Sequence, residues 1–302
     1  MTIMTSRAKG TAQILIDHEQ CILCGRCVNV CCGKPLYMAD GKVQIDQERL
    51  FGCIGCGHCM AVCPKNCIKI KGRELSPDDC FDLPDNAARA KYPELKSLMS
   101  GRRSVRRYLD KAVEQDKIDE ILDAAASAPS GYPPSDVKVL VINGREKVTR
   151  FAFENIEYSS KFRWMFSPLM RILLRPFVGR AAVESYENFI YPALGFFVEA
   201  RSKGEDWLLY GAPVAMLFYG SAYSDPCDPY IAATYAMLAA ESLGLGSCMI
   251  GSVAPFLRHN KKLKEKYGIA QDMREGLIVL FGYSAVEFRR GIRRTFADVK
   301  YC

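Results

Sequence analysis

The cysteines of this sequence are the residues best suited to chemistry, and many of them follow a repeated spacing. The chain has 14 cysteines, and two segments share the pattern C-x2-C-x2-C-x3-C. The first segment contains Cys21, Cys24, Cys27 and Cys31, and the second contains Cys53, Cys56, Cys59 and Cys63. Three thiolates with this spacing can bind one face of an iron-sulfur cubane, while the fourth reaches a second cluster. We therefore predict two 4Fe-4S clusters.

The fourth cysteine of each segment is expected to bind the cluster that the other segment holds with its first three cysteines. This gives two ligand sets. One set is Cys21, Cys24, Cys27 and Cys63, and the other is Cys53, Cys56, Cys59 and Cys31. The glycines Gly25, Gly55 and Gly57 suit a backbone that bends tightly and directs N–H groups toward sulfur. Structural zinc is the rival interpretation, but a zinc site needs four ligands rather than eight in two equal segments.

Residues 12–73 resemble the bacterial two-cluster ferredoxins in both cysteine segments and in the proline, Pro64, that follows the second. Cys32 is a departure, because it stands where the first segment would usually be followed by proline. We expect Cys32 and Cys67 to be small buried residues, although either could perturb a cluster or serve as a spare ligand. His58 is expected to be exposed beside a cluster rather than to bind iron.

The composition describes an ordinary globular protein of two domains. The chain has 302 residues, 49% of them hydrophobic and 25% charged. Residues 1–10 lack the features of a signal peptide, and the apolar stretch at 207–223 is too short to span a membrane. We therefore expect a cytoplasmic location, in which disulfides are rare.

The net charge of +7 does not by itself indicate nucleic acid as a partner. Residues 1–75 contain 10 Lys or Arg against 6 Asp or Glu, and two oxidised clusters add about two negative charges each. The remaining basic clusters, at 102–107 and 289–294, are expected to serve a local anion site. Neither nucleic acid nor a membrane is an expected partner.

The sequence divides into residues 1–75, a linker at 76–94, and a larger domain at 95–302. Pro77, Pro84 and Pro93 interrupt any periodic pattern in the connecting segment, which predicts an irregular linker. In the larger domain, helices are expected at 116–126, 146–155 and 229–243, and strands at 137–142, 213–219 and 277–281. This alternation predicts an α+β layered architecture.

Four motifs in the larger domain could bind an organic cofactor. They are Arg102-Arg103-Ser104-Val105-Arg106-Arg107, Ala128-Pro129-Ser130-Gly131, the stretch from Leu243 to Gly251, and Arg289, Arg290, Arg293 and Arg294. Guanidinium groups beside a hydroxyl suit a phosphate dianion, and the first motif is expected just before a helical segment. The glycine-rich stretch follows a helix, so it is not a dinucleotide fingerprint. A solvated basic face and a tight turn after a helix are the simpler alternatives for these motifs.

In this order the four motifs resemble the nitroreductase family of FMN-dependent oxidoreductases, over residues 95–302. The resemblance implies a three-layer α+β domain, a homodimer and these cofactor-binding residues: Arg102, Arg103, Ser104, Arg106, Pro129, Ser130, Gly131, Met249, Ile250, Gly251, Arg293 and Arg294. The arginines and the serine would hold the FMN phosphate, residues 129–131 would cover the flavin from the partner subunit, and residues 249–251 would direct N–H groups to its N5 edge. Residues 132–136 depart from the family, which leaves the substrate contacts open.

An apolar, basic segment at residues 160–181 has three interpretations. It contains Trp164, Met165, Phe166, Leu169, Met170, Leu173, Leu174 and Phe177, interleaved with Arg163, Arg171, Arg175 and Arg180. It could be an arm that packs in the dimer, a lid over the flavin, or a helix on a membrane surface.

The two cofactors together predict an oxidoreductase that converts single electrons into pairs. An external low-potential donor of the ferredoxin or flavodoxin type would reduce the clusters, and FMN would reduce a nitroaromatic, a quinone or an activated double bond. NAD(P)H stays open as a donor. An electron-transfer adaptor and a redox-sensing regulator are the alternatives. No catalytic residue is assigned, because His18, His58 and His259 all lie outside the flavin motifs.

Overall fold

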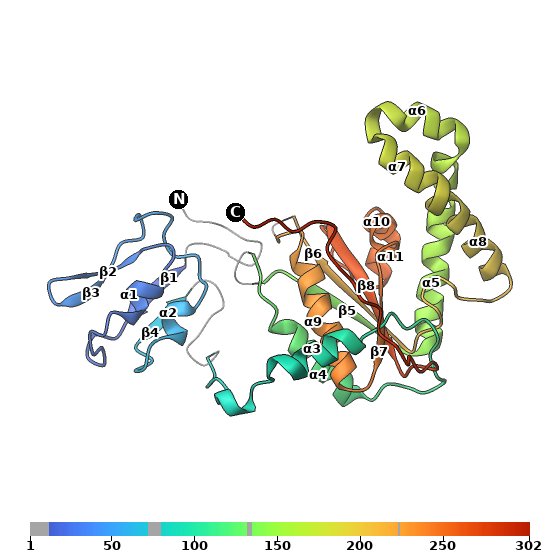
Figure 1. Ribbon diagram of the computed structural model, residues 1–302. Helices are drawn as coiled ribbons and strands as arrows, with labels where there is room; N and C mark the ends of the chain where they lie inside the picture. The colour runs from blue at the N-terminus through green and yellow to red at the C-terminus, as the bar shows by residue number, and fades with distance from the viewer. Residues whose placement is uncertain (1–11, 72–79, 132–134, 223) are drawn as a thin grey trace.

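The N-terminal part of the chain consists of two small sheets and two short helices. The computed structural model describes residues 12–71, 80–131, 135–222 and 224–302 (Figure 1). The elements of this part are β1 (Gln13–Ile16), α1 (Arg26–Val30), β2 (Leu36–Ala39), β3 (Lys42–Ile45), α2 (His58–Ala61) and β4 (Ile68–Lys71). Strand β1 pairs antiparallel with β4, and β2 with β3. The buried side chains that join these elements include Ile14, Leu36 and Ile70.

The segment before the larger domain ends in a helix that the sequence did not predict. Residues 80–91 contain only the 3-10 turn η2 (Asn86–Ala88), and α3 (Tyr92–Gly101) follows. Pro93 lies in the first turn of α3. Backbone N–H groups in the first turn of a helix have no acceptor within the helix, so proline, which has no N–H, is tolerated there. The Glu94 carboxylate accepts the Lys91 N–H at 2.8 Å and caps the helix. The helix therefore crosses the predicted end of the linker at residue 94.

The larger domain is a three-layer α+β structure around one antiparallel sheet. Its strands β5 (Lys138–Asn143), β6 (Val214–Gly220), β7 (Gly246–Ile250) and β8 (Glu275–Gly282) lie in the order β5-β6-β8-β7. Helices α4 (Gln115–Ala126) and α9 (Asp228–Ser242) cover one face, whereas α5 (Arg145–Ser160), α10 (Ala254–Leu257) and α11 (Lys261–Lys266) lie on the other (Figure 1). The predicted fold class is confirmed.

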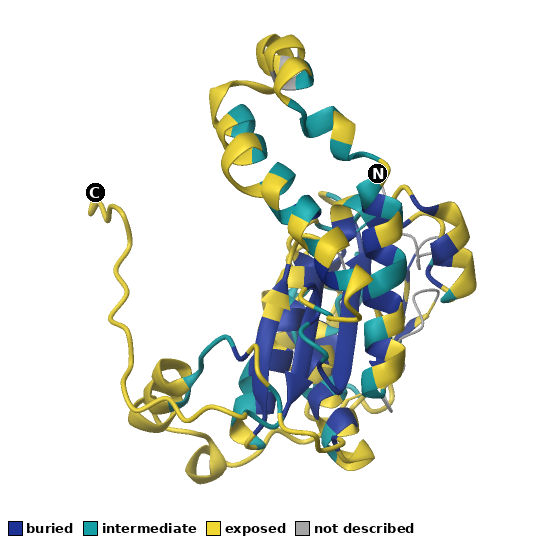
Figure 2. Ribbon diagram, turned by 90° about the vertical axis from the view of Figure 1, so that its right-hand side faces the viewer, coloured by how far each residue is buried: buried dark blue, intermediate teal, exposed yellow. Residues whose placement is uncertain are grey.

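Strand β6 shows why the sheet is buried on both faces. All seven of its residues are buried, as the unbroken apolar run predicts for a central strand. Val214, Met216 and Phe218 pack toward α4 and α9, while the alternate residues Ala215 and Leu217 pack toward α5. In Figure 2 the sheet accordingly forms the dark blue centre of the domain.

A helical excursion projects from the domain between α5 and β6. It contains η3 (Arg163–Phe166), α6 (Pro168–Val178), α7 (Arg180–Ser185), the π-helical turn η4 (Tyr186–Ile190) and α8 (Tyr191–Ser202). Helix α8 returns alongside α5, and α6 and α7 form the outer end of the excursion (Figure 1). We call residues 163–190 the arm. Within the part of the chain that the structure describes, no helix is both long and apolar enough to cross a membrane.

Candidate functional site

The eight cysteines of the repeated segments surround two separate cavities. Cys21, Cys24, Cys27 and Cys63 line the first cavity, and Cys31, Cys53, Cys56 and Cys59 line the second. Each cavity therefore takes three cysteines from one segment and the fourth from the other. The sequence analysis predicts the same two groups of four cysteines, with the fourth cysteine of each segment beside the other cluster. The geometry supports these ligand sets.

The backbone around both cavities fits a cubane cluster. Gly25 and Gly57 precede α1 and α2 with φ angles of 68° and 76°, in the left-handed region that favours glycine. The Gly55 N–H donates to the Cys53 sulfur at 3.4 Å, as backbone groups do around cluster thiolates. Each iron of a cubane takes its own thiolate, so the four sulfurs stand around the cluster instead of converging on one ion. Among the described residues, no group of three or more His, Cys, Asp or Glu is placed to hold a single metal ion.

Burial makes these thiols poor acids before iron binds. It raises the pKa of the Cys59 thiol to about 12, and the neighbouring thiols Cys53 and Cys31 act in the same direction. Burial is also the largest cause that raises the pKa of Cys27 and of Cys56. Iron must therefore displace protons from these thiols, and cluster assembly is coupled to proton release.

The two extra cysteines differ from each other. Cys67 is buried, as expected, and its sulfur lies 3.4 Å from the sulfur of Cys63 in the first cavity. Cys32 lines the second cavity but is exposed, so the expectation that it is buried was wrong. The reason is its position in the turn that follows α1, outside the packed face of that helix. His58 is exposed at the start of α2, as expected.

The arginine motif lies against the edge strand of the sheet. It follows α3, and the helix expected after it is α4, which begins at Gln115 beyond the connecting residues 108–114. Ser104 forms a parallel bridge with Ser247 of β7, and the Val105 N–H donates to the Ser247 carbonyl at 2.9 Å. Residues 246–250 form strand β7, whereas a tight turn after a helix was one of the interpretations of this stretch from the sequence. The arginine motif at 102–107 and the motif from Leu243 to Gly251 are thus brought side by side.

A large cavity opens where these two segments meet the arm. Its volume is about 860 Å³, and Arg106, Met249, Ile250 and Gly251 all line it. Eight aromatic side chains also line it: Tyr158, Phe162, Phe166, Tyr186, Phe189, Phe197, Tyr210 and Phe256. Such a wall favours a flat, apolar occupant, because aromatic rings stack on extended faces and exclude water. We call this space the aromatic cavity.

Tyr210 is held in the wall of the aromatic cavity by a tight loop. Its φ angle of 56° is uncommon for a residue other than glycine and indicates a constrained position. The Asp206 carboxylate accepts the N–H groups of Leu208, Leu209 and Gly211, at 3.1, 2.8 and 3.1 Å. Burial raises the pKa of Asp206, while these N–H groups oppose the shift. The Arg106 guanidinium lies 5.9 Å from the Tyr210 ring centroid.

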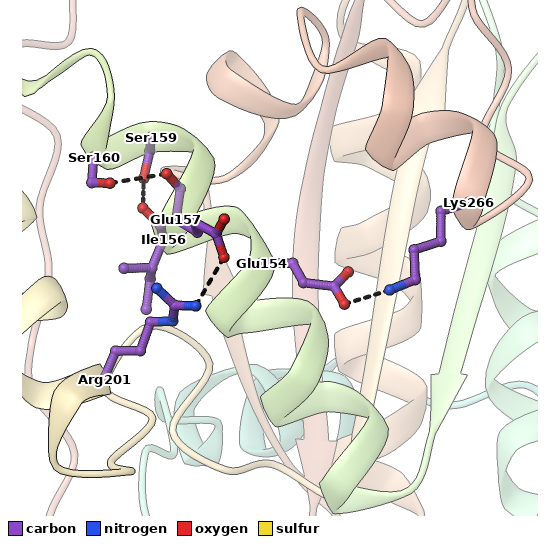
Figure 3. A network of polar contacts seen from close by, with 7 residues as sticks. All are labelled: Glu154, Ile156, Glu157, Ser159, Ser160, Arg201 and Lys266. Carbon is purple, nitrogen blue, oxygen red and sulfur yellow. Dashed lines mark hydrogen bonds and ion pairs between the residues drawn. The ribbon is translucent and has the colours of Figure 1, made fainter.

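Helix α5, which supplies Asn155, Ile156 and Ser159 to the cavity, is fixed on both sides. Figure 3 shows that Glu157 pairs with Arg201 of α8 at 2.9 Å, and that Glu154 pairs with Lys266 of α11. These pairs are partly exposed and contribute little stability, so the position of α5 depends mainly on its buried side chains, such as Phe151 and Ile156.

Two groups of predicted cofactor residues lie away from the aromatic cavity within one subunit. Residues 129–131 pack on the start of α9, where the Gly131 N–H donates to Asp228 Oδ1 at 2.9 Å. Arg293 and Arg294 lie in the exposed C-terminal segment. That segment passes the arginine motif, since a Cβ added to Gly291 would stand 2.7 Å from an Arg103 guanidinium nitrogen. The part of the loop at 132–134 lies outside the described residues.

Sequence reasoning missed several cavity residues. His259 and Arg258 line the aromatic cavity, and Arg258 Nε donates to His259 Nε2 at 3.0 Å. Both follow α10, seven and eight residues beyond Gly251, and that proximity was the available signal. Tyr210 gave no signal, because its constrained backbone is visible only in the structure.

Two family models match consecutive parts of the chain. The 4Fe-4S dicluster domain model matches residues 13–64, and the nitroreductase family model matches residues 99–283, which is more than half of the chain. The chain belongs to the nitroreductase family. The predicted combination of a ferredoxin-type domain for two 4Fe-4S clusters and a nitroreductase-type oxidoreductase domain is confirmed.

Relatives of this nitroreductase family member match one part or the other. An FMN reductase [NAD(P)H] from Bacillus subtilis is 29% identical over 159 residues, covering 53% of this chain and 54% of the relative. Ferredoxin-3 from a Nostoc strain is 36% identical over 69 residues, covering 17% of this chain and 70% of the relative. The Bacillus subtilis oxidoreductase YjgC is 38% identical over 72 residues, covering 19% of this chain but 7% of the relative. The chain thus spans about half of the reductase and little of YjgC.

Solved structures share the fold of the larger domain. A nitroreductase from Bacteroides fragilis with bound FMN has a TM-score of 0.52 and 18% identity, covering 69% of this chain and 98% of that one. The FMN- and NADPH-dependent nitroreductase NfnB from a Sphingopyxis strain has a TM-score of 0.50 and 20% identity, covering 68% of this chain and 98% of that one. At these identities the likeness establishes the fold.

Proposed function

We propose that this protein is an FMN-dependent reductase in which two 4Fe-4S clusters pass electrons to FMN for the reduction of a small, apolar organic acceptor. One observation carries the proposal. The chain combines two cavities, each lined by four motif cysteines, with an aromatic cavity that joins Arg106 to residues 249–251. FMN, when bound, would accept electrons singly and deliver them as a pair.

The residues around the bridge between the arginine motif and β7 fit a flavin phosphate. Arg102, Ser104 and Arg106 bring two guanidinium groups and a hydroxyl to one short segment, which suits a bidentate, charged ligand. The Ser247 hydroxyl is buried and has no hydrogen-bond partner among the described residues. A buried polar group without a partner is costly, and a ligand oxygen beside the motif would satisfy it. We propose that these residues and Arg103 hold the phosphate.

The backbone at 249–251 offers room for the ring system. A Cβ added to Gly251 would have no heavy atom within 4 Å, so open space lies in front of this glycine. The N–H groups of Met249, Ile250 and Gly251 would then contact the edge of the isoalloxazine. Tyr158, Tyr186, Tyr210 and His259 line the same cavity and could hold a proton near the acceptor.

The proposed site needs a second subunit to be complete. Residues 129–131 and the arginines Arg293 and Arg294 do not reach the aromatic cavity within one chain. The C-terminal segment is extended (Figure 2). Its residues Phe296 and Tyr301 are 85% and 95% exposed to solvent. An exposed apolar tail of this kind is typical of a segment that packs on a partner. We propose a homodimer in which the tail and residues 129–131 complete the flavin site.

The test is anaerobic purification followed by quantitation of iron, sulfide and flavin, and then by reduction kinetics. Reduced ferredoxin should reduce the flavin rapidly in the wild-type protein and slowly in a Cys53→Ala/Cys56→Ala variant. Rapid flavin reduction by NADPH in that variant would refute the route through the clusters. Steady-state turnover of a small quinone by the pure protein would separate a reductase from an electron-transfer adaptor, which would show none.

A further inference from the structure

The outer helix of the arm presents a continuous apolar face to solvent. Leu169, Ile172, Leu173 and Phe177 of α6 are exposed by 68%, 72%, 56% and 85%. Their spacing of three, four and eight residues places them on one side of the helix. Figure 2 shows this part of the arm in yellow, apart from the dark blue domain centre. Large apolar side chains on such an outlying helix favour contact with another surface.

From residue 158 to residue 183, a range that includes α6, the charged residues are all basic. Between Glu157 and Glu184 the chain has no acidic residue, while it has Lys161, Arg163, Arg171, Arg175 and Arg180. Helical spacing places positions 171 and 175 opposite the apolar side of α6. Arg175 is exposed, whereas the Arg180 side chain, 83% exposed, pairs with Glu184 at 2.7 Å. A helix with an apolar side and a basic side fits the boundary between an acyl layer and anionic headgroups.

The lining of the aromatic cavity disfavours the interpretation of α6 as a lid. A lid would place α6 residues on the flavin side, yet among the described residues the arm contributes to the aromatic cavity only from η3, α7 and η4, through residues such as Phe166, Ser185 and Phe189. A symmetric dimer contact through the apolar side of α6 would keep positions 171 and 175 away from the partner helix, so the oligomeric state is the measurement that distinguishes a second copy from a lipid surface.

We propose that α6 binds in the plane of a bilayer surface that contains anionic lipids. The apolar side chains of α6 would enter the acyl boundary, and the basic residues around them would contact lipid phosphates. The helix has 11 residues, which is too few to span a bilayer but enough to lie in its surface. This inference goes beyond the proposed function, because it concerns a surface that the flavin and the clusters do not use.

The test is sedimentation of the full-length holoprotein with vesicles. One preparation is phosphatidylcholine alone, and the other is equal parts of phosphatidylcholine and phosphatidylglycerol. The protein should sediment with the anionic vesicles, and high salt should weaken binding, since each basic residue near the surface contributes roughly a factor of five. A Leu169→Gln/Ile172→Gln/Phe177→Gln variant should lose at least about 100-fold in partitioning.

The matched control is Phe81→Gln/Leu83→Gln/Tyr92→Gln, which changes three side chains of similar exposure outside the arm, at 80%, 72% and 73%. It should bind like the wild type. Iron and flavin contents equal to those of the wild type establish that each variant is folded. Absence of wild-type binding, or unchanged binding of the α6 variant, would overturn the proposal. The proposal would also fail if the wild type did not bind vesicles and the α6 variant changed its oligomeric state. That result would indicate that a second copy of the chain covers α6.

Discussion

The backbone N–H of Val105 donates to the carbonyl oxygen of Ser247 at 2.9 Å. This bond attaches the arginine motif to the edge strand β7, so Arg106 and Met249 reach the same cavity. One backbone contact thereby links the proposed phosphate site to the proposed site of the flavin edge. Because β7 is paired with β8 in a buried sheet, the relative position of the two sites is fixed by the domain core.

Gly246 makes this close approach possible. A Cβ added there would stand 2.5 Å from Val105 Cγ2, so Gly246→Ala should push the motif away from β7. We expect a loss of about 1–3 kcal/mol in stability and weaker FMN binding. Thermal melting and FMN titration of the apoprotein measure the two effects. Gly251→Ala is the stability control, because its Cβ would meet no atom within 4 Å; equal melting temperatures for the two variants would contradict this role of Gly246.

Because each cluster takes its fourth cysteine from the other segment, two double variants should differ in iron content. Cys24→Ala/Cys63→Ala removes two thiols from one cavity and should leave about four irons per chain, because the other cluster keeps all its ligands. Cys24→Ala/Cys31→Ala removes one thiol from each cavity and should lose most iron from both. Iron and sulfide analysis after anaerobic purification distinguishes these ligand sets from the alternative in which each segment holds its own cluster. If each segment held its own cluster, the two results would be reversed.

Arg106 should contribute to cofactor affinity more than its neighbour Arg107. Both arginines are exposed, but Arg106 lines the aromatic cavity and Arg107 does not. Loss of a charged hydrogen bond predicts that Arg106→Ala weakens FMN binding by roughly 10- to 100-fold. Flavin fluorescence during titration of the apoprotein measures the dissociation constant. A similar loss in Arg107→Ala would indicate a general effect of net charge instead.

Phe189 should affect the acceptor and not the flavin. Its side chain lines the aromatic cavity although it is 64% exposed, so its removal costs little stability. We expect Phe189→Ser to raise KM for an apolar aromatic quinone by roughly 5- to 20-fold with normal flavin content. Reduction of ferricyanide, a small ionic acceptor, should be unchanged. Phe196→Ser is the control, since Phe196 is 49% exposed and is not among the residues that line the cavity.

The C-terminal tail should hold the proposed dimer together. Deletion of residues 295–302 removes Phe296, Val299 and Tyr301, all exposed in one subunit, and keeps Arg293 and Arg294. The deleted chain should dissociate into monomers at protein concentrations at which the wild type is still dimeric, as light scattering can measure, and should lose flavin on dilution. Arg293→Ala/Arg294→Ala should bind FMN less tightly and stay dimeric. A fully dimeric deletion variant would exclude this role for the tail.

The sequence by itself determined the cluster chemistry and most of the core. Cysteine spacing is a local property, so the two ligand sets could be predicted from residues 21–63 alone. The long apolar helix α9 and the buried strands β6 and β8 were predicted close to their observed bounds, because unbroken apolar runs have few other solutions. Helix α3 was missed because Pro93 was taken as a breaker, whereas the first turn of a helix accepts proline.

Only the tertiary structure decided how the flavin motifs meet. Strand β7 is short and starts with glycine, so its conformation depends on pairing with β8 and on the approach of Val105. The aromatic cavity joins residues from α5, the arm, the loop at Tyr210 and the turn at His259, which are distant in the chain. Its walls result from packing between elements, and no local pattern records such packing. The exposure of α6 was likewise undecided by periodicity, because an amphipathic helix looks the same in sequence whether its apolar side faces a core or solvent.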